Sequence, residues 1–158
     1  MLSNHERKTW RKFFNITTVT IFMTEIRNYQ VSDFPQVREI LERGNLYWEP
    51  SDNEQALERK IRQCPDSILV AVEDERVVGT QFIVEDFLPL MFRLAVHPDY
   101  KGRGVGKALM QQGEQILRQK GYNHVNILVA LNDTELQRYY ERQGYKKGNT
   151  YSWMVKEL

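Results

Sequence analysis

The chain is poor in residues that form disulfides or hold metals. It has a single cysteine, Cys64, so an internal disulfide is excluded, and a reducing compartment suits the composition. Its three histidines, His5, His97 and His124, are scattered and belong to no cluster of potential ligands. We therefore expect no metal site.

Long apolar runs and an excess of charge are also missing. No run of about 18 apolar residues occurs, so we expect no membrane-spanning helix. The 22 Lys and Arg nearly balance the 21 Asp and Glu, which leaves a net charge of +1. This balance gives no overall electrostatic reason to expect nucleic acid or a membrane as a partner. We predict a cytoplasmic protein whose 158 residues suit one domain.

The first 22 residues differ from the rest in charge. They hold one acid, Glu6, and four cations, namely Arg7, Lys8, Arg11 and Lys12. The apolar stretch that follows is interrupted by polar residues, and no small-residue cleavage site comes after it, which argues against a signal peptide. We interpret residues 1–22 as a peripheral extension and residues 23–158 as one domain. A targeting or interaction arm, including one that binds nucleic acid, is the alternative.

Hydrophobic periodicity and capping signals predict the order of helices and strands. The expected strands are 24–30, 67–73, 76–85, 88–96 and 124–130, with a closing hairpin around Gly148-Asn149. The expected helices are one after Ser32 or Asp33, one over 51–63 capped by Ser51 or Asp52, one over about 104–120, and one over 134–143 capped by Asn132 or Asp133. This order predicts a mixed α/β fold, in which an antiparallel meander precedes β-α-β units.

The most distinctive stretch is HPDYKGRGVGKAL, residues 97–109. It is not a Walker loop, because Ala108 replaces the metal-binding hydroxyl and the spacing is too short. It is not a dinucleotide fingerprint either, because Lys107 stands where that pattern needs glycine.

The stretch nevertheless lies between an apolar strand and a helix start, where unpaired amides and the helix dipole attract anions. Glycines let an anion approach the backbone, and Lys101, Arg103 and Lys107 add positive charge. We expect an anion, most simply a pyrophosphate, on the amides of residues 103–107. A glycine-rich loop with solvated charges is the alternative.

The segments LAVHPDYKGRGVGKALM and NDTELQRYYERQGY together resemble the GNAT (Gcn5-related N-acetyltransferase) superfamily, in particular its small stand-alone bacterial members. The resemblance covers residues 23–158. It implies a GNAT fold, with a central mixed, mostly antiparallel sheet flanked by about four helices. It also implies transfer of an acetyl group from acetyl-CoA to a primary amine of a small molecule or peptide, by direct attack in a ternary complex. Relatives commonly form dimers, so a homodimer is a further expectation.

The resemblance also implies how the cofactor is held. The loop from Lys101 to Gly106 matches the motif that cradles the pyrophosphate, with Lys101 in place of the usual Gln or Arg. The strand ending at Val96 pairs with the pantetheine arm, and the N–H of Leu94 or Val96 polarises the thioester carbonyl. Asn132 lies beside the cofactor, caps a helix, or does both. The expected cofactor-binding residues are Leu94, Ala95, Val96, Lys101, Gly102, Arg103, Gly104, Val105, Gly106, Lys107 and Asn132.

Tyr140 matches the tyrosine of the Y-x-x-x-G-[F/Y] ending of the family. The resemblance implies a catalytic role for Tyr140 as the general acid that protonates the departing thiolate of coenzyme A. A tyrosine packed in the core is the alternative, and we interpret the neighbouring Tyr139 as packing.

The sequence does not identify the general base that deprotonates the amine. Relatives that acetylate ribosomal protein N-termini often carry Glu where Ile127 and Leu128 stand here, which argues against the same base. We select Glu85 as the catalytic base, and the other carboxylates considered are Asp86, Glu49 and Asp52. Each can instead be a solvated loop charge. Without an obvious base, a non-catalytic acyl-CoA-binding sensor or partner module is the alternative function.

Four aromatic residues are expected near the acceptor. The side chains are those of Tyr47, Trp48, Tyr151 and Trp153. Aromatic rings attract cationic amines and cover apolar groups, so this set can line the acceptor side. Packing at the edge of the sheet is the alternative.

Overall fold

The computed structural model describes residues 24–156, so the predicted extension over 1–22 lies outside the described residues. Four strands form one antiparallel sheet in the order β1-β2-β3-β4. Their bounds are Glu25–Asn28 for β1, Ile68–Glu73 for β2, Arg76–Val84 for β3 and Leu90–Val96 for β4. The predicted meander is confirmed. Its first turn consists of Asp74 and Glu75, whose φ angles of 48° and 61° are those of a type I′ hairpin.

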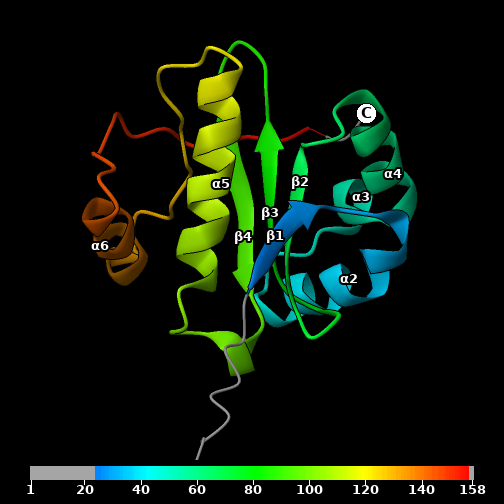
Figure 1. The fold of residues 1–158 in the computed structure, drawn as a ribbon. Coiled ribbons are helices and arrows are strands. Elements are labelled where there is room, and N and C mark those ends of the chain that lie inside the picture. Colours follow the sequence, from blue (N-terminus) through cyan, green and yellow to red (C-terminus); the bar gives the residue numbers. More distant parts are fainter. Residues whose placement is uncertain (1–23, 157–158) are drawn as a thin grey trace, which may run out of the picture.

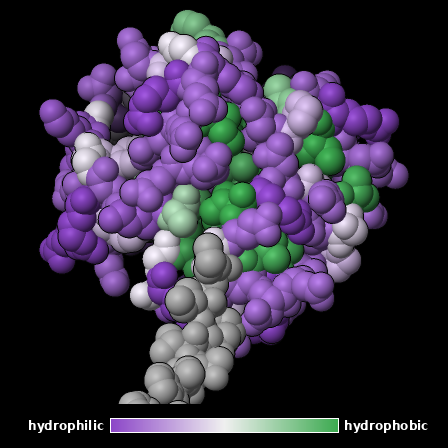
Figure 2. Space-filling model, in the orientation of Figure 1, coloured by the Kyte–Doolittle hydropathy of each residue, from purple (hydrophilic) through white to green (hydrophobic). Residues whose placement is uncertain are grey.

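Helices cover both faces of this sheet. The described α-helices are α2 (Phe34–Arg43), α3 (Glu49–Asp52), α4 (Glu54–Gln63), α5 (Val105–Gln119) and α6 (Thr134–Arg142). Two short 3-10 helices, η2 (Val31–Asp33) and η3 (Pro98–Tyr100), precede α2 and the glycine loop. Figure 1 shows the sheet nearly edge-on, with α5 and α6 on one side and α2, α3 and α4 on the other. In the same orientation, Figure 2 shows a mostly polar surface with apolar atoms gathered near its middle.

The alternation of side chains along the strands divides the core into two layers. Phe82 faces α2 and α4, where it packs with Leu41 and Leu57, whereas its neighbour Ile83 faces α5 and packs with Leu109. On the α5 side the helix lies close to the sheet at Gly113. A Cβ atom added there would lie 2.7 Å from the Met91 sulfur, so only glycine allows this approach.

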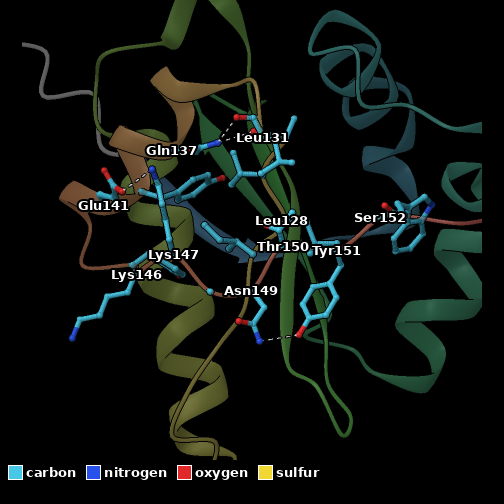
Figure 3. A pocket seen from close by; sticks show the side chains of 17 residues that line it. Leu128, Leu131, Gln137, Glu141, Lys146, Lys147, Asn149, Thr150, Tyr151 and Ser152 are labelled. Carbon is cyan, nitrogen blue, oxygen red and sulfur yellow. Dashed lines mark hydrogen bonds and ion pairs between the residues drawn. The ribbon is translucent and has the colours of Figure 1, made fainter.

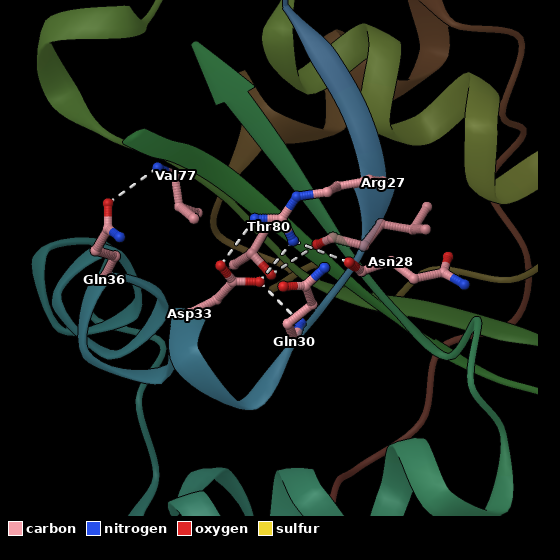
Figure 4. Close-up of polar contacts among 8 residues, drawn as sticks. Arg27, Asn28, Gln30, Asp33, Gln36, Val77 and Thr80 are labelled. Carbon is pink, nitrogen blue, oxygen red and sulfur yellow. Dashed lines mark hydrogen bonds and ion pairs between the residues drawn. The ribbon is translucent and has the colours of Figure 1, made fainter. Parts of the chain in front are cut away.

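Polar groups fix the junction of β1 and α2. The Arg27 guanidinium donates to both carboxylate oxygens of Asp33, at 2.7 and 2.9 Å, and the Gln30 N–H donates to the same carboxylate at 2.8 Å (Figure 4). Helix α2 begins at Phe34, directly after the predicted cap Asp33, but the Asp33 carboxylate accepts from Arg27 and Gln30 and makes no capping hydrogen bond to α2.

The structure corrects one predicted cap and decides between the two candidates for another. The cap at Ser51 or Asp52 is wrong, because residues 49–52 form the separate helix α3 and the Asn53 side chain accepts the Ala56 N–H at 2.9 Å. Such a cap contributes roughly 1 kcal/mol of stability. Of the two residues predicted for α6, Asp133 is the cap, since its Oδ1 accepts the Leu136 N–H at 2.9 Å.

The predicted strand over 124–130 and the closing hairpin at Gly148-Asn149 are wrong. Only one parallel bridge forms, in which Asn126 accepts from the Met91 N–H and donates to the Pro89 carbonyl, both at 2.9 Å. The pairing stops there because β4 carries a bulge just beyond the bridge, and a bulge bends its strand away from a neighbour. Residues 145–156 contain no strand.

Candidate active site

The free edge of β4 carries a bulge. The register with β3 passes from Thr80–Ala95 to Phe82–Phe92, so Arg93 and Leu94 together face Gln81 alone. Arg93 has a φ of 53°, in the left-handed region that favours glycine. Sequence reasoning missed this bulge, although a charged residue inside the apolar run LMFRLAV was a signal for it. After Asn126 the neighbouring chain leaves β4, so the backbone of residues 94–96 is open on one side.

A groove of about 640 Å³ lies among the segments that follow Asn126. Residues 127–131, residues 145–153 and three side chains of α6, including Tyr140, line it (Figure 3). In Figure 1 the C-terminal segment, orange to red, runs from the α6 side of the sheet toward the α4 side. The structure thus brings Tyr140 together with Tyr151 and Trp153, two of the predicted acceptor-side aromatics.

The glycine loop lies at the start of α5. Gly102 and Gly104 have φ angles of 77° and 85°, which a side chain would strain, although a Cβ at either position would meet no atom within 4 Å. Glycine is needed here for its conformation and not for space. None of the N–H groups from Gly102 to Lys107 donates to another group of the described chain. The loop therefore presents a row of free donors at the positive end of the α5 dipole.

Charged side chains surround this row of amides. Arg103 lies over the Tyr100 ring at 4.8 Å, with Nη1 3.8 Å from a carboxylate oxygen of the buried Glu73. Lys101 and Lys107 are exposed and form no ion pair with any described residue. The arrangement can bind a polyanion with backbone and side chains together.

Helix α6 packs against the same loop through Tyr139. A Cβ at Gly106 would lie 3.5 Å from the Tyr139 hydroxyl and 3.6 Å from Val96, so Gly106 marks the meeting point of α5, α6 and β4. The rings of Tyr139 and Tyr140 are 5.3 Å apart in an edge-to-face contact. The loop, the end of β4 and Tyr140 are therefore parts of one site.

Burial keeps the Tyr140 phenol protonated. Desolvation, with a smaller contribution from Tyr139, raises the pKa of Tyr140 to about 12. Its hydroxyl has no hydrogen-bond partner among the described residues. By contrast, the nearby Tyr145 hydroxyl donates to Glu114 at 2.9 Å. Tyr140 thus has a protonated hydroxyl that is free of partners within the described chain, and its role as general acid stays a prediction.

Asn132 does not cap α6, since Asp133 does so. Its side chain is exposed and forms no hydrogen bond within the described chain. The role beside the cofactor stays a prediction for Asn132.

The candidate bases all have partners. At the end of α5 opposite the glycine loop, the Lys120 Nζ forms ion pairs with Glu85 Oε1 at 2.5 Å and with Asp66 Oδ1 at 2.8 Å. The Tyr47 hydroxyl donates to Glu49 at 2.6 Å, and Asp86 accepts the Phe87 N–H at 2.8 Å. Glu85 stays a prediction, and its ion pair with Lys120 argues against a role as a free base.

Two further residues considered from the sequence, Tyr47 and His97, are engaged by neighbouring side chains. The Arg38 guanidinium lies 5.0 Å from the centre of the Tyr47 ring, so a cation already covers one face of that ring. His97 is buried beside Tyr100 at the end of β4. Within residues 24–156, no three His, Cys, Asp or Glu side chains lie close enough to hold a metal ion together. Of the helices in this range, none has the length and apolar character of a membrane span.

Comparisons with known proteins identify the family. The model of the acetyltransferase (GNAT) family matches residues 24–145. An acetyltransferase of Sodalis glossinidius is 33% identical over 135 residues, which cover 85% of this chain and 95% of the relative. One of Pectobacterium atrosepticum is 32% identical over 123 residues, which cover 77% and 87%.

Solved structures share the fold. Ard1 from Thermoplasma volcanium superposes with a TM-score of 0.70 at 22% identity, over 80% of this chain and 84% of that one. The PaiA N-acetyltransferase from Thermoplasma acidophilum, solved with coenzyme A, gives 0.69 at 21% identity, over 82% and 93%. The resemblance stated from the sequence is thereby confirmed: this chain belongs to the GNAT family and is an N-acetyltransferase.

Proposed function

We propose that the protein transfers the acetyl group of acetyl-CoA to a primary amine of a small molecule or peptide, by direct attack in a ternary complex. One observation carries the proposal. The unpaired amides at the start of α5 meet the end of β4 and Tyr139 at Gly106, and the Tyr139 ring contacts that of Tyr140, whose hydroxyl is free and protonated. The coenzyme A complex of the structurally similar PaiA enzyme supports coenzyme A as the carrier.

The cofactor has a place for each of its parts. The pyrophosphate accepts hydrogen bonds from the amides of residues 102–107, with Lys101, Arg103 and Lys107 around it. The pantetheine arm lies along the open backbone of residues 94–96 and leads the thioester to the bulge. Asn132 contacts the arm from the loop before α6.

The chemistry follows from these positions. The N–H of Leu94 or Val96 donates to the thioester carbonyl and stabilises the oxyanion that forms when the neutral amine attacks. When the intermediate collapses, the C–S bond breaks and Tyr140 gives its proton to the thiolate sulfur. The attacking nitrogen carries a positive charge in this intermediate and releases a proton to solvent to leave the neutral amide, and the phenolate of Tyr140 regains a proton from solvent. General acid catalysis of this kind contributes about 100-fold to 10,000-fold in rate.

The amine must lose a proton before it attacks. Glu85 is the predicted base, but its carboxylate forms an ion pair with Lys120, so it must change partner to act. We therefore propose that solvent takes this proton, with Glu85 as the group to test by Glu85→Gln. A sensor without catalysis is not proposed, because the curated relatives are named acetyltransferases.

The experiment is release of free thiol from acetyl-CoA with a panel of amines and N-terminal peptides. We expect a rate that rises with amine concentration and a matching acetylated product in the mass spectrum. Acetyl-CoA binding without transfer to any acceptor of the panel would contradict the proposed reaction. Absence of binding would contradict the assignment of the loop as well.

A further inference from the structure

A buried ion pair joins α3 to the bulge of β4. Asp52 is 1% exposed, and its Oδ2 accepts from Arg93 Nε at 3.0 Å and from the Trp48 N–H at 2.8 Å. A carboxylate this deeply buried is stable only when its charge is compensated. Arg93 precedes Leu94, one of the two residues proposed to polarise the thioester. The pair therefore fixes the side chain of Arg93 toward α3, one residue before the proposed donor Leu94.

Arg93 keeps donors that this ion pair does not use. A guanidinium carries five N–H groups, and only the Nε–H of Arg93 donates to Asp52. No described residue accepts from Nη1 or Nη2, and the side chain is 21% exposed. The Phe92 ring, 5.8 Å from Cζ, lies on one side of the guanidinium. Two parallel N–H groups thus remain accessible, which is the arrangement that binds a carboxylate through both of its oxygens.

The neighbouring charge adds a second requirement. Glu49 belongs to the same short helix as Asp52 and is exposed, with its carboxylate held by the Tyr47 hydroxyl. A negative charge there favours a ligand that also carries an ammonium group. An acceptor with an ammonium and a carboxylate matches both.

Resting on the proposed function, we propose that the acceptor is a free amino acid whose carboxylate binds Nη1 and Nη2 of Arg93. Binding at Arg93 brings the α-amino group, one carbon away from the carboxylate, toward the thioester beside Leu94. The N-terminus of a peptide has an amide in place of this carboxylate and lacks the bidentate contact. Arg93 is thus a specificity-determining residue for the acceptor.

The test compares matched acceptors in threes with the wild-type protein. Each set holds an amino acid, its amide and its decarboxylated amine, for example L-leucine, L-leucinamide and 3-methylbutylamine, with equivalent sets for L-phenylalanine and L-glutamate. Acetylated product is measured by mass spectrometry alongside thiol release. We expect kcat/KM for the amino acid to exceed that for the other two by roughly tenfold or more in at least one set, because a site built for a charged group rejects the analogue that lacks it.

The pKa of the amino group alone would favour the amide over the free amino acid as acceptor. The α-amino group of an amide titrates near that of a peptide N-terminus, about 8, so more of it is neutral at a given pH than in the free amino acid. A preference for the amino acid therefore cannot come from amine reactivity.

Arg93→Lys is the matching variant, because lysine keeps a cation for Asp52 but loses the paired donors. We expect the ratio of kcat/KM between amino acid and amide to fall at least tenfold, while KM for acetyl-CoA stays within about twofold. Arg62→Lys, in the exposed pair with Glu58, is the control and should leave the ratio unchanged.

The outcomes separate the two proposals. If amides and amines are acetylated as well as the amino acids, this inference is wrong and the proposed function stands. If no member of any set is acetylated while another amine or peptide of the wider panel is, this inference is wrong and the proposed function stands; if nothing in the sets or the panel is acetylated, both are wrong. An unchanged ratio in Arg93→Lys would overturn the role of Arg93 whatever the acceptor preference of the wild type.

Discussion

At the scale of single residues, the site depends on where two similar tyrosines lie. Tyr139 and Tyr140 are neighbours in sequence, but Tyr139 packs against Gly106 and Met110 whereas Tyr140 lines the groove. Burial raises the pKa of Tyr140 to about 12, so it stays protonated over the whole range in which amines become neutral. The difference between the packing tyrosine and the proposed proton donor is thus one of position.

Tyr140→Phe tests the proton donor. We expect kcat to fall by about 100-fold or more with little change in KM for acetyl-CoA, because the thiolate then leaves without a proton. Steady-state thiol release measures both quantities. Tyr139→Phe is the matched control and should retain kcat within a few-fold. Equal activity in the wild type and Tyr140→Phe would show that Tyr140 is not the acid.

At the scale of elements, the glycine loop and α5 form a unit with two different ends. Gly104 begins α5 with a φ of 85°, and Gly121 follows its end with a φ of 91°. Neither would meet an atom within 4 Å if it gained a Cβ. The two positions therefore carry the same conformational demand, but only the first lies beside the free amides.

Because Gly104 and Gly121 share this conformational demand, a variant of Gly121 is the control for the same variant of Gly104. Alanine in the left-handed region costs about 1–2 kcal/mol, so Gly104→Ala and Gly121→Ala should lower thermal stability alike. Only Gly104→Ala should raise KM for acetyl-CoA, by roughly fivefold or more, because the strained loop no longer aims its N–H groups at the pyrophosphate. Calorimetry and steady-state kinetics provide the readouts. A similar KM in both variants would argue against anion binding by this loop.

At the scale of the whole molecule, one buried and two half-buried phenols make the fold sensitive to alkali. Burial is the main cause that raises the pKa of Tyr29, Tyr140 and Tyr145, and hydrogen bonds to carboxylates raise that of Lys120 against its desolvation. Each of these groups binds its proton more tightly when folded than when unfolded. Stability therefore falls as the pH rises above about 10, the ordinary value for tyrosine.

Urea unfolding between pH 8 and 12 measures this effect. We expect the free energy of unfolding to be level up to about pH 9 and to decrease from pH 10 toward pH 12. Tyr140→Phe removes one titrating group, so its curve should decrease less steeply over the same interval. Parallel curves for the two proteins would show that Tyr140 titrates alike in the folded and unfolded states.

The sequence by itself determined the local elements of this protein. The apolar stripes of α2, α4, α5 and α6, the meander and the glycine loop follow from spacing over a few residues, and the structure contains them close to their predicted bounds. The resemblance in the loop and around Tyr140 was enough to identify the family. These features are readable because periodicity, turn conformation and helix starts are properties of neighbouring residues.

Only the tertiary structure decided which strand edges pair and which charged side chains form ion pairs. Residues 124–130 have the composition of a strand, yet they form one bridge, because pairing depends on the shape of β4 and not on their own sequence. The bulge at Arg93, and the choice of Arg93 as partner for Asp52 some 41 positions earlier, are contacts between distant residues that no local pattern encodes. The ion pair between Glu85 and Lys120, which removes the selected base from free use, arises in the same way.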